Sequence, residues 1–255
     1  MLRIPTLEQL KAMKLNGMAK GFEEQFASSD YDGMSFEERV GLMVDRERTE
    51  RENRSLALRL RHAKLKQGAC FEDIDYRNQR GLDKSLAKSL ASCQWIREHL
   101  NVLVTGPTGV GKSFIAEALG HKACLEGFKV RAYRATRLFE ELAISRGDGR
   151  YVKLMDQLAK IHLIIIDDWG LSKLKESEQK DFLELLEDRH NRHSTIVASQ
   201  MPHEHWHELM TNPTLADAIL DRLIHNSYKL NLKGESMRKR KSTLTGPLET
   251  AKRKN

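Results

Sequence analysis

The sequence predicts an α/β protein, in which a parallel β-sheet flanked by helices follows a small all-helical N-terminal domain. From Asn101 onward, short apolar runs alternate with segments of helical periodicity, and the runs are NVLVT, KVRAYRA, LIIID, STIVAS and YKLNL. Apolar strands that alternate with helices indicate a parallel sheet covered on both faces. Residues 6–66, by contrast, contain only helical patterns.

Two capping-box spacings mark helix starts in this N-terminal region, Thr6 with Gln9 and Ser35 with Glu38. Residues 46–66 carry 8 basic and 3 acidic side chains. The segment is either a solvent-exposed face with internal ion pairs or a helix that contacts DNA, and composition alone favours the first.

Changes in composition predict the domain boundaries. We expect a helical domain over residues 1–67 that binds DNA or a partner, and a turn-rich linker over 68–84. The α/β domain then spans 85–237, and residues 238–255 form a basic, flexible tail.

Composition predicts a globular protein without a membrane segment. The 255 residues are 40% apolar and 31% charged. No apolar run approaches the roughly 20 residues that cross a bilayer, and the N-terminus lacks the apolar core of a signal peptide. Three widely spaced cysteines without metal-ligand spacing indicate reduced thiols, so the predicted location is the cytoplasm.

The net charge is concentrated near the C-terminus. From Lys229 to Asn255 there are 9 basic and 2 acidic residues, so the whole net charge of +7 falls in this stretch. Such a tail either keeps a protein soluble or contacts the phosphates of a nucleic acid.

The stretch GPTGVGKS fills the pattern G-x-x-x-x-G-K-[ST] between a predicted strand and a predicted helix. Glycines let backbone N–H groups turn toward phosphates, and the helix N-terminus adds partial positive charge. Lys112 is predicted to reach the β- and γ-phosphates of ATP, and Ser113 to supply a hydroxyl to Mg²⁺. The predicted nucleotide-binding residues are Gly106, Pro107, Thr108, Gly109, Val110, Gly111, Lys112, Ser113 and Phe114.

In LIIIDDWG, four aliphatic residues run directly into two acids. A carboxylate at the end of a buried strand requires a nearby cation. We expect this strand to lie next to the strand before the phosphate loop, so that Asp167 approaches Mg²⁺ through Ser113 or water. Asp168 is then the candidate that orients and deprotonates the attacking water. Alternatively, the two acids only cap a turn before Gly170.

These motifs, with STIVASQ and DRLIHNSYKLNLKGESMRK, follow one another as in AAA+ ATPases of the DnaC-like group. More closely, the chain resembles the IstB family, the helper ATPases of bacterial transposons, from roughly Leu2 to Lys241. The most family-specific parts are FEDIDYRNQRGLD, LIIIDDWG and KGESMRK. The resemblance implies a bacterial AAA+ ATPase with ATP and Mg²⁺ as cofactors.

The resemblance also implies roles for single residues. Ser199, or Gln200, matches the polar sensor at the end of the strand beside the acidic strand. Arg222 matches the arginine that one subunit inserts into the ATP site of the next, which implies a homo-oligomeric ring or spiral. Without the motif, Asp221 and Arg222 would be read as an ordinary surface pair.

DnaC-like proteins insert helices that line a DNA channel between their second and third strands, and residues 137–160 occupy that position. The implied DNA contacts are Arg137, Arg146, Arg150 and Lys153, and a solvent-exposed amphipathic face is the alternative. Such contacts would hold the phosphate backbone and give weak sequence preference.

The chain departs from the AAA+ pattern in two ways. Many members carry Glu where this chain has Asp168, so hydrolysis is expected to be slow or stimulated by assembly or a partner. Only residues 233–255 follow YKLNL, so no C-terminal lid domain is expected. Arg238 is a candidate replacement for the arginine of the lid.

HEHWH, from His203 to His207, matches the zinc-protease pattern H-E-x-x-H. The pattern is short, follows Pro202, and lacks a third ligand, because Glu208 adjoins His207 on the helix. We therefore do not predict zinc hydrolysis, and incidental zinc affinity is left open.

The leading functional hypothesis is an ATP-dependent transposition helper that oligomerises on double-stranded DNA, selects or remodels target DNA and engages a cognate transposase. The basic segments support the DNA part, and the transposase rests on the resemblance alone. The alternatives are a replicative-helicase loader of the DnaC kind and a nucleotide-gated binding module without hydrolysis.

Overall fold

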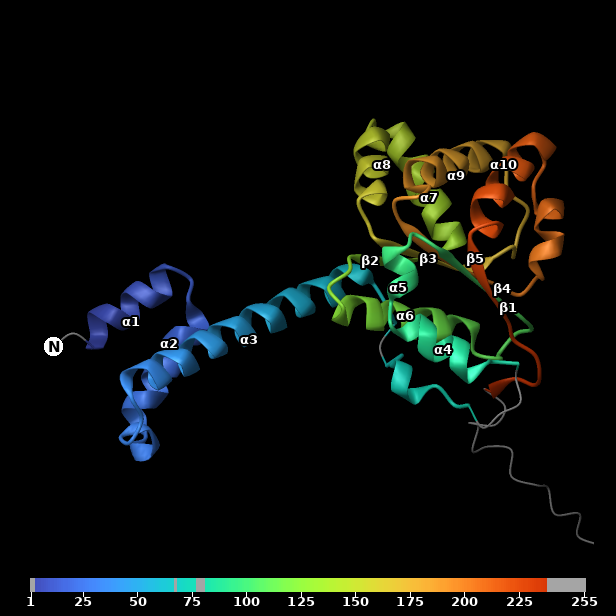
Figure 1. Cartoon of the computed structure of the whole chain (residues 1–255). Coiled ribbons are helices and arrows are strands. Elements are labelled where there is room, and N and C mark those ends of the chain that lie inside the picture. Colours follow the sequence, from blue (N-terminus) through green and yellow to red (C-terminus); the bar gives the residue numbers. More distant parts are fainter. Residues whose placement is uncertain (1–2, 67, 77–80, 238–255) are drawn as a thin grey trace, which may run out of the picture. The chain divides into compact units, whose positions relative to one another are not determined.

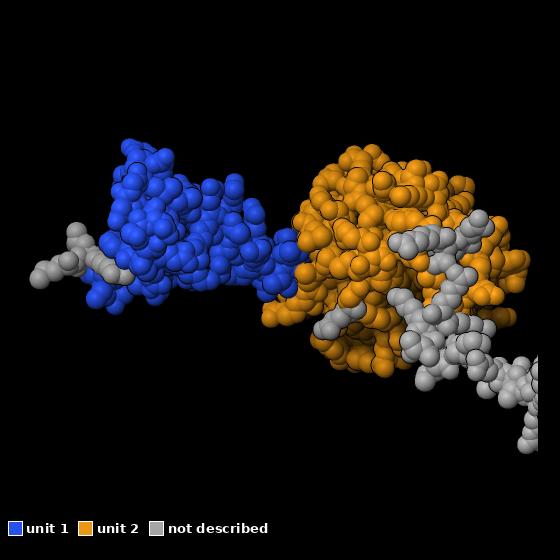
Figure 2. All heavy atoms as spheres, turned by 90° about the horizontal axis from the view of Figure 1, so that it is seen from below, with its two compact units in different colours: residues 1–59 blue, residues 60–255 orange. Residues whose placement is uncertain are grey.

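The computed structural model describes residues 3–66, 68–76 and 81–237. The chain divides into two units, Met1–Arg59 and Leu60–Asn255 (Figure 2). The larger unit therefore begins at Leu60, ahead of residue 67, the end of the predicted helical domain. No helix of the described residues is long and apolar enough to cross a membrane.

Helices build the N-terminal unit, as predicted. They are α1 (Arg3–Ala12), α2 (Asn16–Ala27), η1 (Ser29–Tyr31) and α3 (Phe36–Ala63), which continues past the unit boundary. Ser35 and Glu38 form the predicted capping box, in which Ser35 N donates to Glu38 Oε2 at 2.7 Å and Glu38 N to Ser35 Oγ at 3.3 Å. Thr6 was wrongly predicted as a cap, because α1 already begins at Arg3.

Five parallel strands form the sheet of the larger unit, and all five were predicted. They are β1 (Asn101–Thr105), β2 (Val130–Arg134), β3 (Leu163–Trp169), β4 (Ser194–Ser199) and β5 (Ser227–Asn231). Their order is β2-β3-β4-β1-β5. The sequence had suggested that the acidic strand β3 lies next to β1. That expectation was wrong, because β4 pairs with both strands and lies between them.

Helices cover both faces of the sheet (Figure 1). One face carries α4 (Lys84–Ala91) and α6 (Lys112–Leu125), near the short α5 (Gln94–Arg97). The other carries α7 (Ala135–Gly147), α8 (Tyr151–Ala159), α9 (Glu176–Arg189) and α10 (Pro213–Ile224). The predicted helical insertion between the second and third strands is α7 and α8. After β5, no lid domain is found among the described residues.

Residues of the predicted linker pack against the larger unit. The segment contains the short η2 (Phe71–Asp73), and Ala69 and Ile74 are buried against Ala118 of α6. Residues 77–80 lie outside the described residues. Where the structure describes it, the segment is therefore part of the surface of the sheet unit.

Trp169 anchors the end of β3. It is 1% exposed, and its ring lies 4.9 Å from that of Phe182 and 5.8 Å from that of Trp206, measured between centroids. Burial of large aromatic side chains dominates the stability of such a core. The residue that follows the two acids is thus fixed, which restricts where their carboxylates point.

Candidate nucleotide-binding site

The phosphate loop connects the carboxyl end of β1 to the N-terminus of α6, as predicted. Gly106, Gly109 and Gly111 have φ angles of 143°, 83° and 100°. Side chains with a Cβ atom rarely adopt this region, so glycine is required for the turn. The loop ends where the helix begins, so the N-terminus of α6, with its partial positive charge, lies at the loop.

A C-terminal segment, Leu232–Met237, lies against this loop. Leu232 N donates to Thr105 O at 2.7 Å, and Met237 N to Gly109 O at 2.9 Å. A Cβ atom on Gly109 would lie 2.1 Å from Ser236 Oγ. The motif KGESMRK therefore borders the predicted nucleotide site, although Arg238 itself lies outside the described residues.

Lys112 and Ser113 begin α6 in the predicted positions. Lys112 is 8% exposed, and its ammonium donates to Pro107 O at 2.9 Å across the loop. Ser113 Oγ donates to Asp167 Oδ1 at 2.9 Å. The two predicted metal ligands are therefore in contact, although β4 lies between β1, which precedes the phosphate loop, and β3, which carries Asp167. The partly buried side chain of Phe114 packs against the cluster of Ala69, Ile74 and Ala118.

A local irregularity at the end of β3 directs the two acids differently. Asp168 has a φ of 60°, and the pairing of β3 with β4 shifts register between Ile166 and Trp169. An irregularity of this kind changes the direction of the side chains near the end of the strand. Asp167 is 8% exposed beside Ser113, whereas the Asp168 side chain is 36% exposed.

Protein cations lie beside both acids, and the sequence did not reveal them. Lys66 Nζ is 3.5 Å from Asp167 Oδ2 and also 3.5 Å from Glu117 Oε1. Arg134 Nε is 3.7 Å from Asp168 Oδ2. Of these neighbours, only the acid Glu117 could have been found from the sequence, because it lies four residues after Ser113 and hence on the same face of α6. Lys66 and Arg134 come from segments whose proximity depends on the fold.

The two sensor candidates differ in their contacts. Ser199 is fully buried, and its hydroxyl donates to Trp169 O at 2.7 Å and accepts from Met201 N at 3.1 Å. Gln200 is exposed, and its Oε1 accepts a hydrogen bond from Thr108 Oγ1 of the phosphate loop at 2.7 Å. Ser199 thus fixes the strand end, and Gln200 presents its amide to the loop.

Arg222 lies at the opposite end of the sheet from the phosphate loop. From α10 it lines a recess together with Asn101 and Thr195. Asn101 is the first residue of β1, and Thr195 is the second residue of β4. Its guanidinium donates to Ala218 O at 2.8 Å and to Glu187 Oε1 at 2.9 Å. Arg222 therefore cannot reach the phosphate loop of its own chain, and its role toward a neighbouring subunit stays a prediction.

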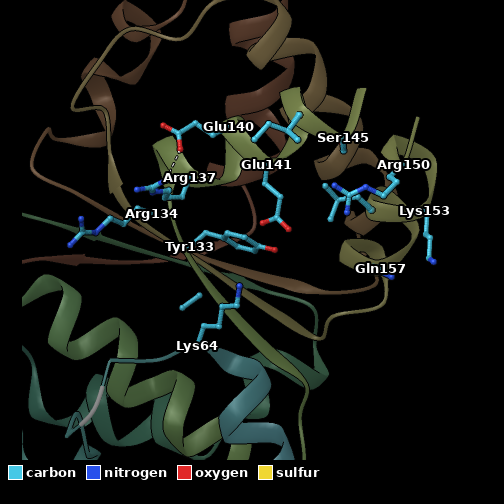
Figure 3. A pocket seen from close by; sticks show the side chains of 13 residues that line it. Lys64, Tyr133, Arg134, Arg137, Glu140, Glu141, Ser145, Arg150, Lys153 and Gln157 are labelled. Atoms are coloured by element: carbon cyan, nitrogen blue, oxygen red, sulfur yellow. Dashed lines mark hydrogen bonds and ion pairs between the residues drawn. The ribbon is translucent and has the colours of Figure 1, made fainter. Parts of the chain in front are cut away.

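Three of the four predicted DNA contacts meet in one cleft of about 670 Å³. Arg137, Arg150 and Lys153 line it from α7, the turn before α8, and α8 (Figure 3). Lys64 and Arg134 add positive charge, and Glu140 and Glu141 add negative charge. Arg137 pairs with Glu140 at 3.0 Å, and Arg150 Nε with Asp148 at 2.9 Å, so phosphates would have to compete with these acids.

Arg146, the fourth candidate, is held elsewhere. Its Nε donates to Asp181 at 2.9 Å, and its guanidinium stacks 3.6 Å from the centroid of the Tyr151 ring. The basic segment 46–66 also contains internal ion pairs. In the described residues, Arg51 pairs with Glu47 inside the segment, and Arg46 pairs with Glu24 of α2. These contacts favour structural roles.

The HEHWH stretch forms a 3₁₀ helix, η3 (His203–Leu209), and not the α-helix that the zinc-protease pattern requires. Positions i and i+4 do not share a face in a 3₁₀ helix. His203 Nδ1 lies 3.2 Å from Glu204, whereas His207 Nε2 lies 3.4 Å from Asp217. Among the described residues, no group of three or more His, Cys, Asp or Glu side chains could hold a metal ion.

Comparison with known proteins agrees with this arrangement. The family described as IstB-like ATP binding protein matches residues 8–245. The insertion sequence ATP-binding protein y4pL of Sinorhizobium fredii is 50% identical over 239 residues, which cover 94% of this chain and 98% of y4pL. The ATP-binding protein of insertion sequence IS21 from Pseudomonas aeruginosa is 31% identical and covers 95% of this chain and 90% of its own length.

The solved structure of DnaI superposes with a TM-score of 0.55 at 20% identity, over 64% of this chain and 90% of DnaI. At this identity the similarity concerns the fold alone. The family match extends over the phosphate loop, the acidic strand end and Arg222. This chain therefore belongs to the family of IstB-like ATP-binding proteins, and its sheet unit has the AAA+ fold.

Proposed function

We propose that this chain is an ATP-dependent helper of transposition. With ATP and Mg²⁺ it oligomerises on duplex DNA, selects or remodels a target site, engages a cognate transposase and hydrolyses ATP to ADP and phosphate. The observation that carries the ATPase part is the 2.9 Å contact between Ser113 and Asp167 beside the phosphate loop. The names of the relatives, which are ATP-binding proteins of insertion sequences, support the transposition part.

The chemistry assigns a separate task to each residue. Lys112 stabilises the charge of the β- and γ-phosphates, and Ser113 and Asp167 hold Mg²⁺, directly or through water. Mg²⁺ neutralises charge that develops on the phosphate oxygens. Asp168 orients the attacking water and accepts its proton, and Arg222 of a neighbouring subunit stabilises the transferred phosphoryl group.

DNA binding is assigned to the cleft lined by Arg137, Arg150 and Lys153. Their charges contact phosphates and not base edges, so we expect weak sequence preference and a steep loss of affinity with salt. Replacement of both Arg150 and Lys153 by Gln should weaken duplex binding. It should also reduce the slope of log affinity against log salt by up to about two. An unchanged slope would place the DNA elsewhere.

The central experiment measures binding of labelled duplex and single-stranded DNA with ATP, ADP or no nucleotide, and images the ATP complexes by electron microscopy. ATP-dependent assemblies around duplex DNA are expected. Preference for single strands together with retention of a hexameric helicase would instead indicate a helicase loader. ATP-dependent assembly without phosphate release, with and without transposase, would indicate a nucleotide-gated binding module.

A further inference from the structure

Lys66 contributes a positive charge to the metal side of the site, although it belongs to none of the nucleotide-binding motifs. Its ammonium lies between Asp167 Oδ2 and Glu117 Oε1, at 3.5 Å from each. The two carboxylate side chains are only 11% and 10% exposed, whereas the Lys66 side chain is 57% exposed. The cation can therefore move, while the acids are fixed.

The two acids require a cation for a physical reason. The Glu117 and Asp167 side chains are almost entirely removed from solvent, and a buried charge is costly unless an opposite charge lies beside it. Two nearly buried carboxylates that face each other repel unless a positive charge bridges them. Lys66 supplies that charge and allows Asp167 to keep its hydrogen bond with Ser113.

We propose that Lys66 is a resident counter-ion of the metal site, and that Mg²⁺ displaces it from Asp167 when nucleotide binds. This inference rests on the proposed Mg²⁺ site at Ser113 and Asp167. Mg²⁺ binds oxygen ligands at about 2.1 Å, so an ion on Asp167 would lie within roughly 6 Å of the ammonium and repel it.

The geometry permits this exchange. The 3.5 Å contacts of Lys66 are longer than the roughly 2.7–2.9 Å of strong charge-assisted hydrogen bonds, and the Lys66 side chain is more than half exposed to solvent, which weakens its attraction to the acids. Glu117 remains as a partner for the displaced ammonium. The acids are thus satisfied in both states, by lysine before loading and by the metal after it.

The first test titrates Mg²⁺ against the binding of a fluorescent ADP analogue. Lys66→Met removes the competing charge and should lower the half-saturating Mg²⁺ concentration roughly threefold, the effect of a partly exposed ion pair. Lys66→Arg should stay close to the unmodified chain, as should Lys88→Met, a control at an exposed lysine of α4. An unchanged or raised Mg²⁺ requirement in Lys66→Met would overturn the proposal.

The second test measures how fast an amine-acylating reagent modifies Lys66, by peptide mass spectrometry relative to Lys122. Mg²⁺ with ADP should speed the modification of Lys66, and ADP with a chelator should not. A rate that is unchanged, or slowed because the amine binds phosphate, contradicts displacement. If the unmodified chain fails to bind ADP at any Mg²⁺ concentration, the proposed function fails as well. If binding of the ADP analogue depends on Mg²⁺ but Lys66 has no effect on it, only the counter-ion proposal is overturned.

Discussion

Arg134 Nε lies 3.7 Å from the carboxylate of Asp168, and Arg134 also lines the basic cleft. The acid assigned to the attacking water thus has a cationic neighbour on the surface assigned to DNA. The Asp168 side chain is 36% exposed, so the pair is accessible to solvent and weak. Asp168 can therefore exchange this partner for a water molecule.

Asp168→Asn should preserve ATP binding and block hydrolysis, because an amide cannot accept the proton of the attacking water. Phosphate release should fall by about 100-fold or more, and ATP-dependent DNA complexes should persist. Release of phosphate and the lifetime of the DNA complex are the measurements. Asp156→Asn, at an exposed position of α8, is the matched control. Complexes that vanish in Asp168→Asn would contradict the assigned role.

Lys112→Ala should abolish ATP binding and, with it, assembly on DNA when the variant is tested without another copy that binds ATP. Lys112 is 8% exposed, and its ammonium donates to the carbonyl of Pro107 at the loop, where the phosphates are predicted to bind. Equilibrium binding of a fluorescent ATP analogue measures the effect. Lys122→Ala, in the last turn of the same helix, removes a surface pair with Glu126 and should bind normally. Comparable ATP binding by both variants would mean that Lys112 does not bind the nucleotide.

Arg222→Ala should leave nucleotide binding by isolated subunits nearly intact and reduce assembly-dependent turnover by about 10³-fold or more. A mixture with Lys112→Ala should recover part of the turnover, because one variant supplies the intact loop and the other the arginine. Glu187→Gln is the control, since it removes the ion-pair partner of Arg222 and keeps the guanidinium. A mixture as inactive as either variant would argue against action across a subunit boundary.

Two glycines with positive φ angles, Gly106 at 143° and Gly127 at 91°, should differ in their tolerance of alanine. A Cβ atom on Gly106 would lie 2.2 Å from Leu232 O, whereas one on Gly127 would meet no atom within 4 Å. Gly127→Ala should lower the free energy of unfolding by about 1 kcal/mol, the penalty for a positive φ. Gly106→Ala should lower it by at least about 3 kcal/mol, because backbone must also move. Urea unfolding measures the loss of stability in both variants. Equal losses would be inconsistent with the close contact between Gly106 and Leu232.

His193 should make the fold sensitive to acid. Burial, with the positive charge of Arg189, lowers the pKa of His193 from 6.5 to about 4. The unfolded chain therefore binds a proton that the folded chain excludes, so stability present above pH 6.5 is lost as pH falls toward 4. His193→Gln should reduce the difference between urea midpoints at pH 7 and pH 5. His190→Gln, at an exposed position, should not, and an undiminished difference in His193→Gln would assign the loss to other groups.

The sequence predicted the central strands well because segments such as NVLVT and LIIID are short apolar runs, and it predicted the phosphate loop because its glycines and lysine lie within one stretch of eight residues, GPTGVGKS. Contacts between distant segments were not accessible in the same way. The place of β4 between β1 and β3 depends on how the sheet is ordered, which the run LIIIDD does not encode. For the same reason Lys66 and Arg134 could not be identified as neighbours of the two aspartates.

The separation of Arg222 from the phosphate loop has a consequence for stoichiometry. If the arginine acts in trans, copies join head to tail through unlike surfaces, and the array has a direction. A closed circle would complete a site at every junction. An open spiral would always leave one terminal loop without its arginine, so the average turnover per copy would increase with the length of the array.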